Sequence, residues 1–177
     1  ALADADVRAL FGPSEDGMMR RVFPEGSETA LAAYFEEFTR MLPACEPLHP
    51  ELRAALLLLR ERRVPTALVT GKARVTALLS LRHFGMEDLF DAVETGSPEG
   101  GVKRPAIRGL LERWRVTPAE AIYVGDAASD MLDARDVGAV GVGAAWSGGS
   151  AAELAAAGAG HVFTDPREFL GWLRART

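Results

Sequence analysis

From Leu48 to the C-terminus the chain alternates between strand-type and helix-type hydrophobic patterns, and this alternation constrains the fold more than any other feature. Short apolar runs, of which Ala121–Val124 is the clearest, are each followed by a longer stretch with apolar residues at helical spacing. Units of this kind recur about every 20 to 30 residues, which is typical of βα units in a parallel sheet. The sequence therefore predicts an α/β protein with a Rossmann-like parallel sheet.

The same periodicity predicts the individual elements. Strands are expected over residues 66–69, 89–93, 121–124, 139–144 and 161–163, and the strand at 121–124 should be buried. Helices are expected before the first strand, over 73–84, after Lys103, over 131–137 up to Gly138, over 151–157 and after 165. The inward residues of two of these helices should be Val75, Leu78 and Leu79, and Ile107, Leu110, Leu111 and Trp114.

Residues 1–47 show no convincing strand pattern. Helices are expected over Asp4–Phe11, from the N-cap Ser14 through Phe23, and over Ser27–Leu42. Prolines at positions 43, 47 and 50 then mark a boundary. We therefore predict a small helical subdomain over residues 1–47, followed by an α/β core over residues 48–177.

Composition narrows the class of protein. The 177 residues are 48% hydrophobic and 25% charged, which suits one globular domain that carries a small subdomain. The net charge of −5 and the scattered basic residues argue against a nucleic-acid partner, and no apolar run approaches the ~20 residues of a membrane span. Cys45 is the only cysteine, so we expect no internal disulfide and an ordinary packed thiol in a cytoplasmic protein.

Two carboxylates stand at the end of the predicted strand 121–124. Asp126 lies where open α/β sheets place their ligands, and Asp130 lies four residues further on, as the next helix begins. Close carboxylates repel each other unless a cation lies between them, and Mg²⁺ prefers oxygen ligands. The pair therefore indicates a Mg²⁺ site, although capping of the helix N-terminus explains the same pattern when the stretch is taken alone.

Two other predicted strand ends carry groups that suit a phosphate. Thr70 offers a hydroxyl, and Gly71 lets a backbone N–H approach a ligand at the positive N-terminus of the next helix. Lys103 adds a mobile positive charge. Because neighbouring strand ends meet at one edge of a parallel sheet, these groups and the acidic pair predict a phosphoryl-transfer site that still lacks a nucleophile.

Other patterns of phosphate chemistry fit less well. A P-loop would need a glycine where Thr66 stands and a serine or threonine where Ala73 stands. A dinucleotide fingerprint at Gly141 and Gly143 lacks its third glycine. A phospho-acceptor signalling domain shares the threonine, the lysine and the acidic pair, but it does not explain the helical residues 1–47.

These motifs resemble motifs two, three and four of the haloacid dehalogenase superfamily in order and spacing. The matching stretches are Thr70-Gly71-Lys72, Lys103-Arg104-Pro105, and Gly125-Asp126 with Asp130. The run from His83 to Asp91 is also similar to this family, and the resemblance covers essentially all of residues 1–177. Within the superfamily the chain is most similar to the phosphoglycolate phosphatase and β-phosphoglucomutase group, whose caps are small helical bundles inserted after motif one.

The resemblance implies a Mg²⁺-dependent phosphatase that works through an aspartyl-phosphate intermediate. Thr70 would hold a phosphoryl oxygen, and Lys103 would neutralise charge on the phosphate and the nucleophile. Asp126 would bind Mg²⁺, and Asp130 would support the metal shell or orient Lys103.

The resemblance also implies that residues 1–47 are a cap which supplies specificity. The loop at Gly12-Pro13-Ser14-Glu15 would lie over the active site. The candidates for substrate contact are Ser14, Glu15, Arg20 and Arg21, and helix capping or solvated charge explains them equally well. The partner would be a small phosphorylated metabolite, with sugar phosphates, phosphoglycolate and nucleotide monophosphates all compatible, and the oligomeric state is left open.

The chain departs from the family pattern at motif one. Family members begin with an apolar strand that ends in Asp-x-Asp and supplies the nucleophile, whereas Asp4-Ala5-Asp6 matches only the letters. Without that strand, the strands that carry Thr70 and Asp126 would face each other across an unfilled gap. We expect the nucleophile to lie outside these 177 residues, which should be inactive by themselves.

Two alternatives to a phosphatase are kept. A phosphomutase of the same superfamily differs mainly in the cap, and a catalytically inactive relative would act as a binding or regulatory protein. A dehalogenase would use a similar aspartate without a metal, so the acidic pair at Asp126 and Asp130 argues against it.

Overall fold

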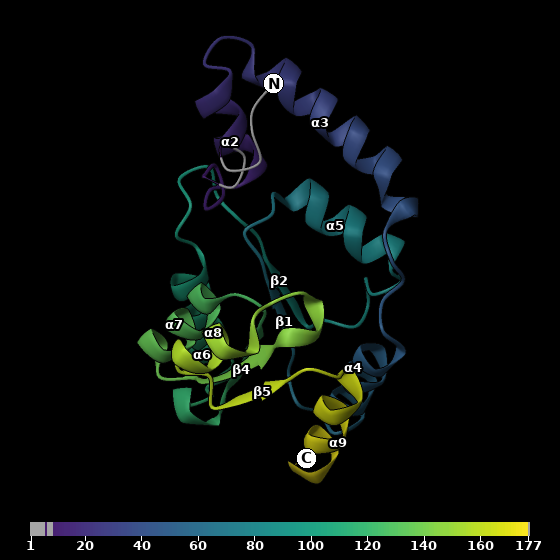
Figure 1. Ribbon diagram of the computed structural model, residues 1–177, viewed down its shortest axis with the longest axis vertical. Coiled ribbons are helices and arrows are strands. Elements are labelled where there is room, and N and C mark those ends of the chain that lie inside the picture. The colour runs from purple at the N-terminus through teal and green to yellow at the C-terminus, as the bar shows by residue number, and fades with distance from the viewer. Residues whose placement is uncertain (1–5, 7–8, 177) are drawn as a thin grey trace. The chain divides into compact units, whose positions relative to one another are not determined.

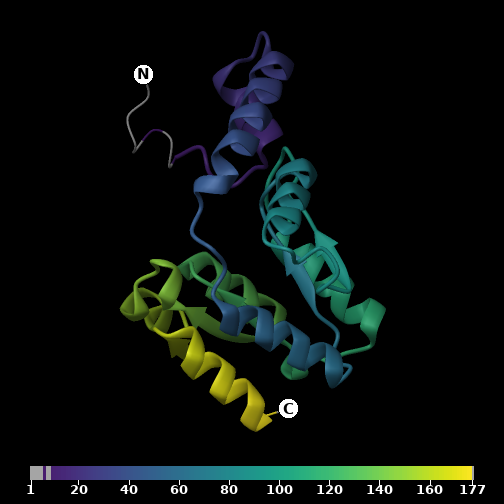
Figure 2. The ribbon, with the colours of Figure 1, turned by 90° about the vertical axis from the view of Figure 1, so that its right-hand side faces the viewer.

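The computed structural model describes residue 6 and residues 9–176, which form two compact units. Unit 1 comprises residues 1–47 and 67–103, and unit 2 comprises residues 48–66 and 104–177. Each unit has its own parallel sheet, and Figures 1 and 2 show the ribbon in two views. The predicted boundary after residue 47 is also a boundary between the units, while residues 67–103 group with the N-terminal helices.

Unit 1 combines helices and a 3₁₀ turn with a two-stranded sheet in the part of the chain that the structure describes. Its elements are α2 (Glu15–Val22), α3 (Ser27–Met41), η1 (Leu42–Ala44), β1 (Ala67–Val69), α5 (Arg74–His83) and β2 (Ala92–Glu94). Strands β1 and β2 are parallel, with Ala67 opposite Ala92 and Val69 opposite Glu94. Helix α2 begins after Ser14, as predicted, whereas the helix predicted over residues 4–11 falls largely outside the described part of the chain.

Unit 2 is built around a three-stranded sheet in the order β3-β4-β5, with all strands parallel. The strands are β3 (Ile122–Gly125), β4 (Val140–Ala144) and β5 (His161–Phe163). The helices are α4 (Pro50–Glu61), α6 (Lys103–Trp114), η2 (Pro118–Glu120), α7 (Ala128–Val137), η3 (Ala145–Ser147), α8 (Ala151–Ala156) and α9 (Pro166–Arg176). Alternating parallel strands and helices confirm the predicted α/β class, and Gly138 ends α7 in the left-handed conformation that favours glycine.

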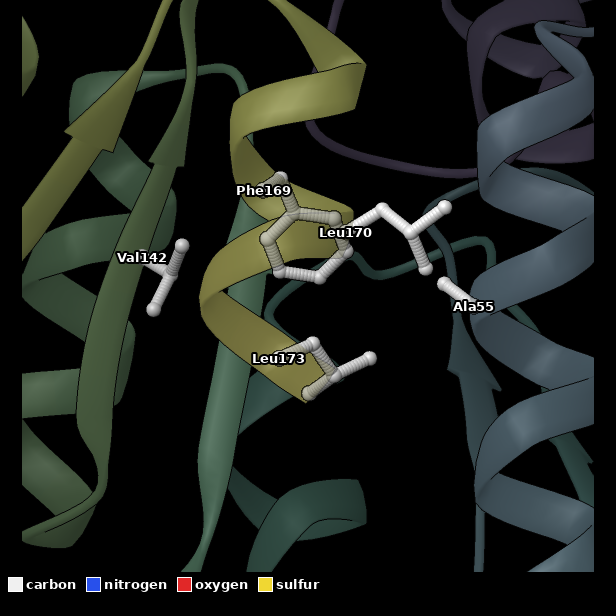
Figure 3. Packing of buried hydrophobic residues seen from close by; sticks show 5 residues of the cluster. All are labelled: Ala55, Val142, Phe169, Leu170 and Leu173. Atoms are coloured by element: carbon white, nitrogen blue, oxygen red, sulfur yellow. The ribbon is translucent and has the colours of Figure 1, made fainter. Parts of the chain in front are cut away.

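The core of unit 2 joins α4, β4 and α9. Its buried residues are Ala55, Val142, Phe169, Leu170 and Leu173, and Figure 3 shows Phe169 and Leu173 on α9 with Val142 to one side and Ala55 to the other. Burial of each large side chain stabilises the fold by about 1.5–3 kcal/mol. Three of the four inward residues predicted for α6 are confirmed, since Ile107, Leu110 and Leu111 are buried, whereas Trp114 is only half-buried.

Several predictions of burial and of element bounds were wrong. Helix α5 buries Thr76, Ala77 and Leu81, whereas Val75 and Leu78 are 46% and 37% exposed. The inward stripe is displaced because Thr76, a polar residue, faces a buried carboxylate of α2. The strand expected over residues 89–93 is β2 at Ala92–Glu94, and the thiol of Cys45 is exposed rather than packed.

Strand β3 is an edge strand rather than a buried one. In the described part of the chain β3 pairs only with β4, and β1 pairs only with β2. Ile122 and Val124, on one face of β3, are accordingly 42% and 40% exposed. None of the helices in residue 6 and residues 9–176 combines the length and apolar character needed to cross a membrane.

Candidate active site

The turn after β1 carries the predicted phosphate-binding residues of unit 1. The Thr70 N–H donates to the Glu94 carbonyl over 3.0 Å, which continues the pairing with β2. The Thr70 hydroxyl in turn accepts the Lys72 N–H over 3.2 Å, and this bond closes the turn. A Cβ added at Gly71 would meet nothing within 4 Å, so the backbone of the turn is open at this residue.

A second glycine, which the sequence patterns did not single out, packs against this turn. The Gly96 N–H donates to the Lys72 carbonyl over 2.7 Å, and a Cβ at Gly96 would overlap the Gly71 carbonyl. Only a residue without a side chain fits this approach. The sequence signal that could have pointed to Gly96 is the glycine- and proline-rich composition of residues 96–101.

Two of the four candidate substrate-contact residues are buried in unit 1. Ser14 is 1% exposed and Glu15 is 5% exposed. One oxygen of the Glu15 carboxylate accepts the Ala73 N–H, and the other accepts the Thr76 hydroxyl over 2.7 Å. Glu15 therefore caps the N-terminus of α5, a role that no local pattern predicted.

The other two candidates, Arg20 and Arg21, are exposed on the last turn of α2. The pKa of the Glu99 carboxyl is lowered, chiefly by the Ser97 hydroxyl and to a smaller extent by the charge of Arg20. The Arg20 guanidinium thus acts on the loop between β2 and α6. Lys103, the first residue of α6, ends that loop and is half-buried.

The acidic pair lies at the end of β3 in unit 2. Asp126 is exposed and Asp130 is 4% exposed. The Asp130 carboxylate accepts the Ala127 N–H over 3.2 Å and the Tyr123 hydroxyl over 3.4 Å. A Cβ at Gly125 would overlap the Asp130 side chain, so glycine is required for this aspartate to pack against the strand end. Asp130 therefore caps α7, which was the alternative role for the pair.

Tyr123 completes the surroundings of Asp130. Burial and, next, the Asp130 charge raise the pKa of the Tyr123 hydroxyl well above its ordinary value of 10.0. The phenol therefore stays protonated near neutral pH and remains able to donate to the aspartate.

The acidic pair suits Mg²⁺ by the chemistry of its donors. Mg²⁺ takes oxygen ligands, usually keeps several waters and commonly binds through one or two carboxylates. The described residues hold no group of three or more histidine, cysteine, aspartate or glutamate side chains that could enclose a metal ion. The carboxylate oxygens of the two aspartates are thus compatible with Mg²⁺ as a ligand set.

The predicted site is divided between the two units. Unit 1 holds seven of its residues: Ser14, Glu15, Arg20, Arg21, Thr70, Gly71 and Lys103. Unit 2 holds Asp126 and Asp130. The residues predicted to contact phosphate therefore belong to unit 1, and the carboxylates predicted to bind Mg²⁺ belong to unit 2.

The family model for haloacid dehalogenase-like hydrolases matches residues 1–144. The chain belongs to this family. Both the parallel α/β fold and the motifs at Thr70, Lys103 and Asp126 agree with that membership. The family itself is described as one of hydrolases.

Curated relatives of this chain carry two different activities in their names. A phosphoglycolate phosphatase of Synechococcus elongatus is 30% identical over 142 residues, which cover 78% of the chain and 66% of the relative. The tyrosine-protein kinase PtkA of Mycobacterium tuberculosis is 32% identical over 145 residues, which cover 80% of the chain and 50% of the relative. The chain thus spans between half and two thirds of the length of these relatives.

Solved structures share the fold of this chain over nearly its whole length. A Thermotoga maritima protein assigned as a β-phosphoglucomutase is 25% identical, with a TM-score of 0.75 over 99% of the chain and 84% of that protein. CbbY of Rhodobacter sphaeroides, solved in complex with phosphate, is 17% identical, with a TM-score of 0.77 over 95% of the chain and 80% of that protein. The phosphoglycolate phosphatase and β-phosphoglucomutase group within the superfamily is therefore the one this chain resembles.

Proposed function

We propose that this chain forms the cap and most of the core of a Mg²⁺-dependent phosphatase that hydrolyses a small phosphorylated metabolite in the cytoplasm. The observation that carries the proposal is the end of β3, where exposed Asp126 and buried Asp130 stand together in a haloacid dehalogenase-like hydrolase. The phosphoglycolate phosphatase relative supports a small phosphate ester as the substrate class. Residues 1–47 would be the cap that gives specificity.

Each half of the site would have a separate task. In unit 1 the Thr70 hydroxyl and the open backbone at Gly71 would hold phosphoryl oxygens, and the Lys103 ammonium would neutralise their charge. In unit 2 Asp126 would hold Mg²⁺, and Asp130, fixed by Ala127 and Tyr123, would orient that site. Bound Mg²⁺ would supply charge stabilisation to the phosphoryl group.

The nucleophile in this proposal is an aspartate outside the 177 residues. Its carboxylate oxygen would attack phosphorus, the ester oxygen would leave as an alcohol, and water would then cleave the aspartyl-phosphate to release inorganic phosphate. Strands β1 and β3 each have a single strand neighbour in the described part of the chain, and Ile122 and Val124 expose apolar surface on β3. Such edges can accept a further parallel strand. Asp4-Ala5-Asp6 lies mostly outside the described residues.

The decisive experiment examines the gene upstream of Ala1 and the activity of its product. An apolar strand ending in Asp-x-Asp should be encoded there, and the product should release phosphate from p-nitrophenyl phosphate only with Mg²⁺. Asp126→Asn and Lys103→Ala should each lower kcat/KM by about 100-fold or more, because each removes charge stabilisation from the transition state. Asp136→Asn, on the solvent side of α7, is the control and should keep activity. Full activity of Asp126→Asn would refute the assignment.

A phosphomutase is the second candidate, supported by the likeness to the Thermotoga maritima protein. A mutase would transfer the phosphoryl group back to a sugar instead of to water. Incubation of the same gene product with a sugar monophosphate, followed by ³¹P NMR, separates the two. Release of inorganic phosphate supports the phosphatase, and interconversion of two sugar phosphates supports the mutase. No activity on either substrate supports an inactive binding or regulatory protein.

A further inference from the structure

We propose that Glu15 is a positioning residue that docks the loop before α2 onto the start of α5 and thereby holds the Thr70–Lys72 turn in place. The inference rests on the proposed function only in assigning that turn to phosphate. Its central claim concerns the structure of unit 1, and it can be tested without any activity.

Helix α5 begins without a cap of its own. Its N-cap residue is Ala73, whose side chain offers no hydrogen-bond acceptor. The Ala73 N–H instead donates to Glu15, as does the hydroxyl of Thr76 one turn into the helix. Ala73 is 5% exposed and Thr76 is 0% exposed, so water has little access to replace the carboxylate. A buried donor that loses its acceptor destabilises the fold, and the turn just before Ala73 depends on this contact.

The start of α2, which carries Glu15, is fixed from its other side as well. The Ser14 N–H donates to the Ser97 carbonyl over 2.8 Å. A Cβ at Gly17 would overlap the Pro98 carbonyl, so α2 packs directly on the backbone of the β2–α6 loop. The loop before α2 therefore lies between the start of α5 and the β2–α6 loop, which are the segments that lead from Thr70 and to Lys103.

Helix α3 adds further contacts to the same region. The Lys72 ammonium lies 5.0 Å from the centre of the Phe38 ring, a cation–π contact between the turn and α3. The pKa of the Tyr34 hydroxyl is raised, chiefly by burial and next by the charge of Glu15. Both oxygens of the carboxylate accept hydrogen bonds from the start of α5, and its charge acts on the Tyr34 hydroxyl of α3.

Amide hydrogen exchange on the 177-residue chain tests the docking. Glu15→Ala should speed exchange of the Lys72 and Ala73 amides by about 10-fold or more, because the turn and the first N–H of α5 lose their anchor. Glu15→Gln should stay near the native rate, because its carbonyl can accept the Ala73 N–H while its NH₂ donates to Thr76. Asp16→Asn is the matched control, since it removes a charge from the same first turn of α2 without touching α5. Unchanged rates at Lys72 and Ala73 in Glu15→Ala would overturn the proposal.

A double-mutant cycle keeps the test decisive if Glu15→Ala unfolds. Thr76→Val conserves the shape of the side chain and removes the hydroxyl that donates to Glu15. Thr76→Val should speed exchange at Ala73 in the native background and have little further effect beside Glu15→Leu, which keeps the bulk of the side chain and removes both acceptor oxygens. Independent, additive effects of the two substitutions would show that the pair does not act as a unit and would refute the docking.

Binding of inorganic phosphate separates this inference from the proposed function. If the native chain binds phosphate and Glu15→Ala weakens that binding by about 10-fold, both are supported. If Glu15→Ala loosens the turn and leaves phosphate affinity unchanged, the positioning role is wrong and the proposed function stands. If the native chain binds no phosphate, the assignment of the turn loses its support, and the exchange rates at Lys72 and Ala73 still decide the docking.

Discussion

The helices that follow β1 and β3 start in similar ways, yet their capping carboxylates come from different distances along the chain. Helix α7 takes its cap from its own first turn, where Asp130 accepts the N–H of Ala127, three residues before it. Helix α5 takes its cap from Glu15, which precedes Ala73 by 58 residues. Both carboxylates are nearly buried, and both favour the positive end of a helix.

The cap of α7 is therefore a local contact, whereas the cap of α5 is a tertiary contact. The cap of α7 forms as soon as the helix forms, because donor and acceptor are close in sequence. The cap of α5 forms only when α2 packs on unit 1, so the order of the Thr70–Lys72 turn depends on the N-terminal helices. The following substitutions test that contrast, in order of decreasing expected effect.

The glycines at the two strand ends should respond very differently to alanine. Gly125→Ala should lower the free energy of unfolding by about 3 kcal/mol and weaken Mg²⁺ binding, because the new Cβ overlaps the Asp130 side chain. Gly71→Ala should change stability by less than about 0.5 kcal/mol, because nothing lies within 4 Å of its Cβ. Urea unfolding and calorimetric Mg²⁺ titration measure both. If Gly125→Ala and Gly71→Ala lower the free energy of unfolding equally, the two strand ends do not differ in packing as described.

Gly17 in α2 and Gly109 in α6 form a second pair of glycines for comparison. Gly17→Ala should destabilise by about 1–2 kcal/mol, because overlap with the Pro98 carbonyl outweighs the higher helix propensity of alanine. Gly109→Ala, at an exposed position of α6 with nothing near its Cβ, should stabilise by about 0.5–1 kcal/mol. Urea midpoints of the two variants should therefore move in opposite directions. A stabilising Gly17→Ala would mean that α2 does not pack tightly on the β2–α6 loop.

Tyr123 gives the local cap a dependence on alkaline pH. The folded protein raises the pKa of this phenol above 10.0, so Tyr123 ionises at a lower pH in the unfolded chain than in the folded protein. The free energy of unfolding that this hydroxyl contributes is therefore fully present below about pH 10 and falls as the pH rises further. Tyr123→Phe should cost about 1 kcal/mol at pH 7 and should reduce the alkaline loss. Tyr34→Phe is the comparison on the remote cap, since the pKa of Tyr34 is also raised. Free energies of unfolding measured between pH 8 and about 11.5 test this pH dependence. If the free energy of Tyr123→Phe falls with pH as steeply as that of the native chain, the prediction is contradicted.

The smallest effect is expected on the outer side of α7. Arg104 pairs with Asp133 over 2.7 Å and with Asp136 over 2.9 Å, and its side chain is 52% exposed. Arg104→Ala should therefore cost only about 0.5 kcal/mol, and the loss should disappear in about 1 M salt, where such pairs are screened. Arg135→Ala, which removes a longer pair to Asp136, should cost less still. If Arg104→Ala lowers the free energy of unfolding by more than about 2 kcal/mol, its ion pairs with Asp133 and Asp136 behave as buried rather than surface pairs.

Much of the fold was predictable because its signals are local. The helix over residues 103–114 with Ile107, Leu110 and Leu111 inward, and the end of α7 at Gly138, follow from spacing and backbone preference and were confirmed. The inward face of α5 was not predictable in this way. Val75 and Leu78 are the more apolar choices, but the carboxylate of Glu15 turns the Thr76 face inward.

The sequence by itself determined the βα alternation, the strand ends at Thr70 and Asp126, and the family to which those motifs point. These features depend on residues within one turn or one strand of each other, so pattern and composition carry them. Only the tertiary structure decided that Glu15 caps α5, that Gly96 and Gly17 must lack side chains, and that Ile122 and Val124 lie on an exposed edge. Those facts depend on which distant segments meet, and no local preference encodes a contact across 58 residues.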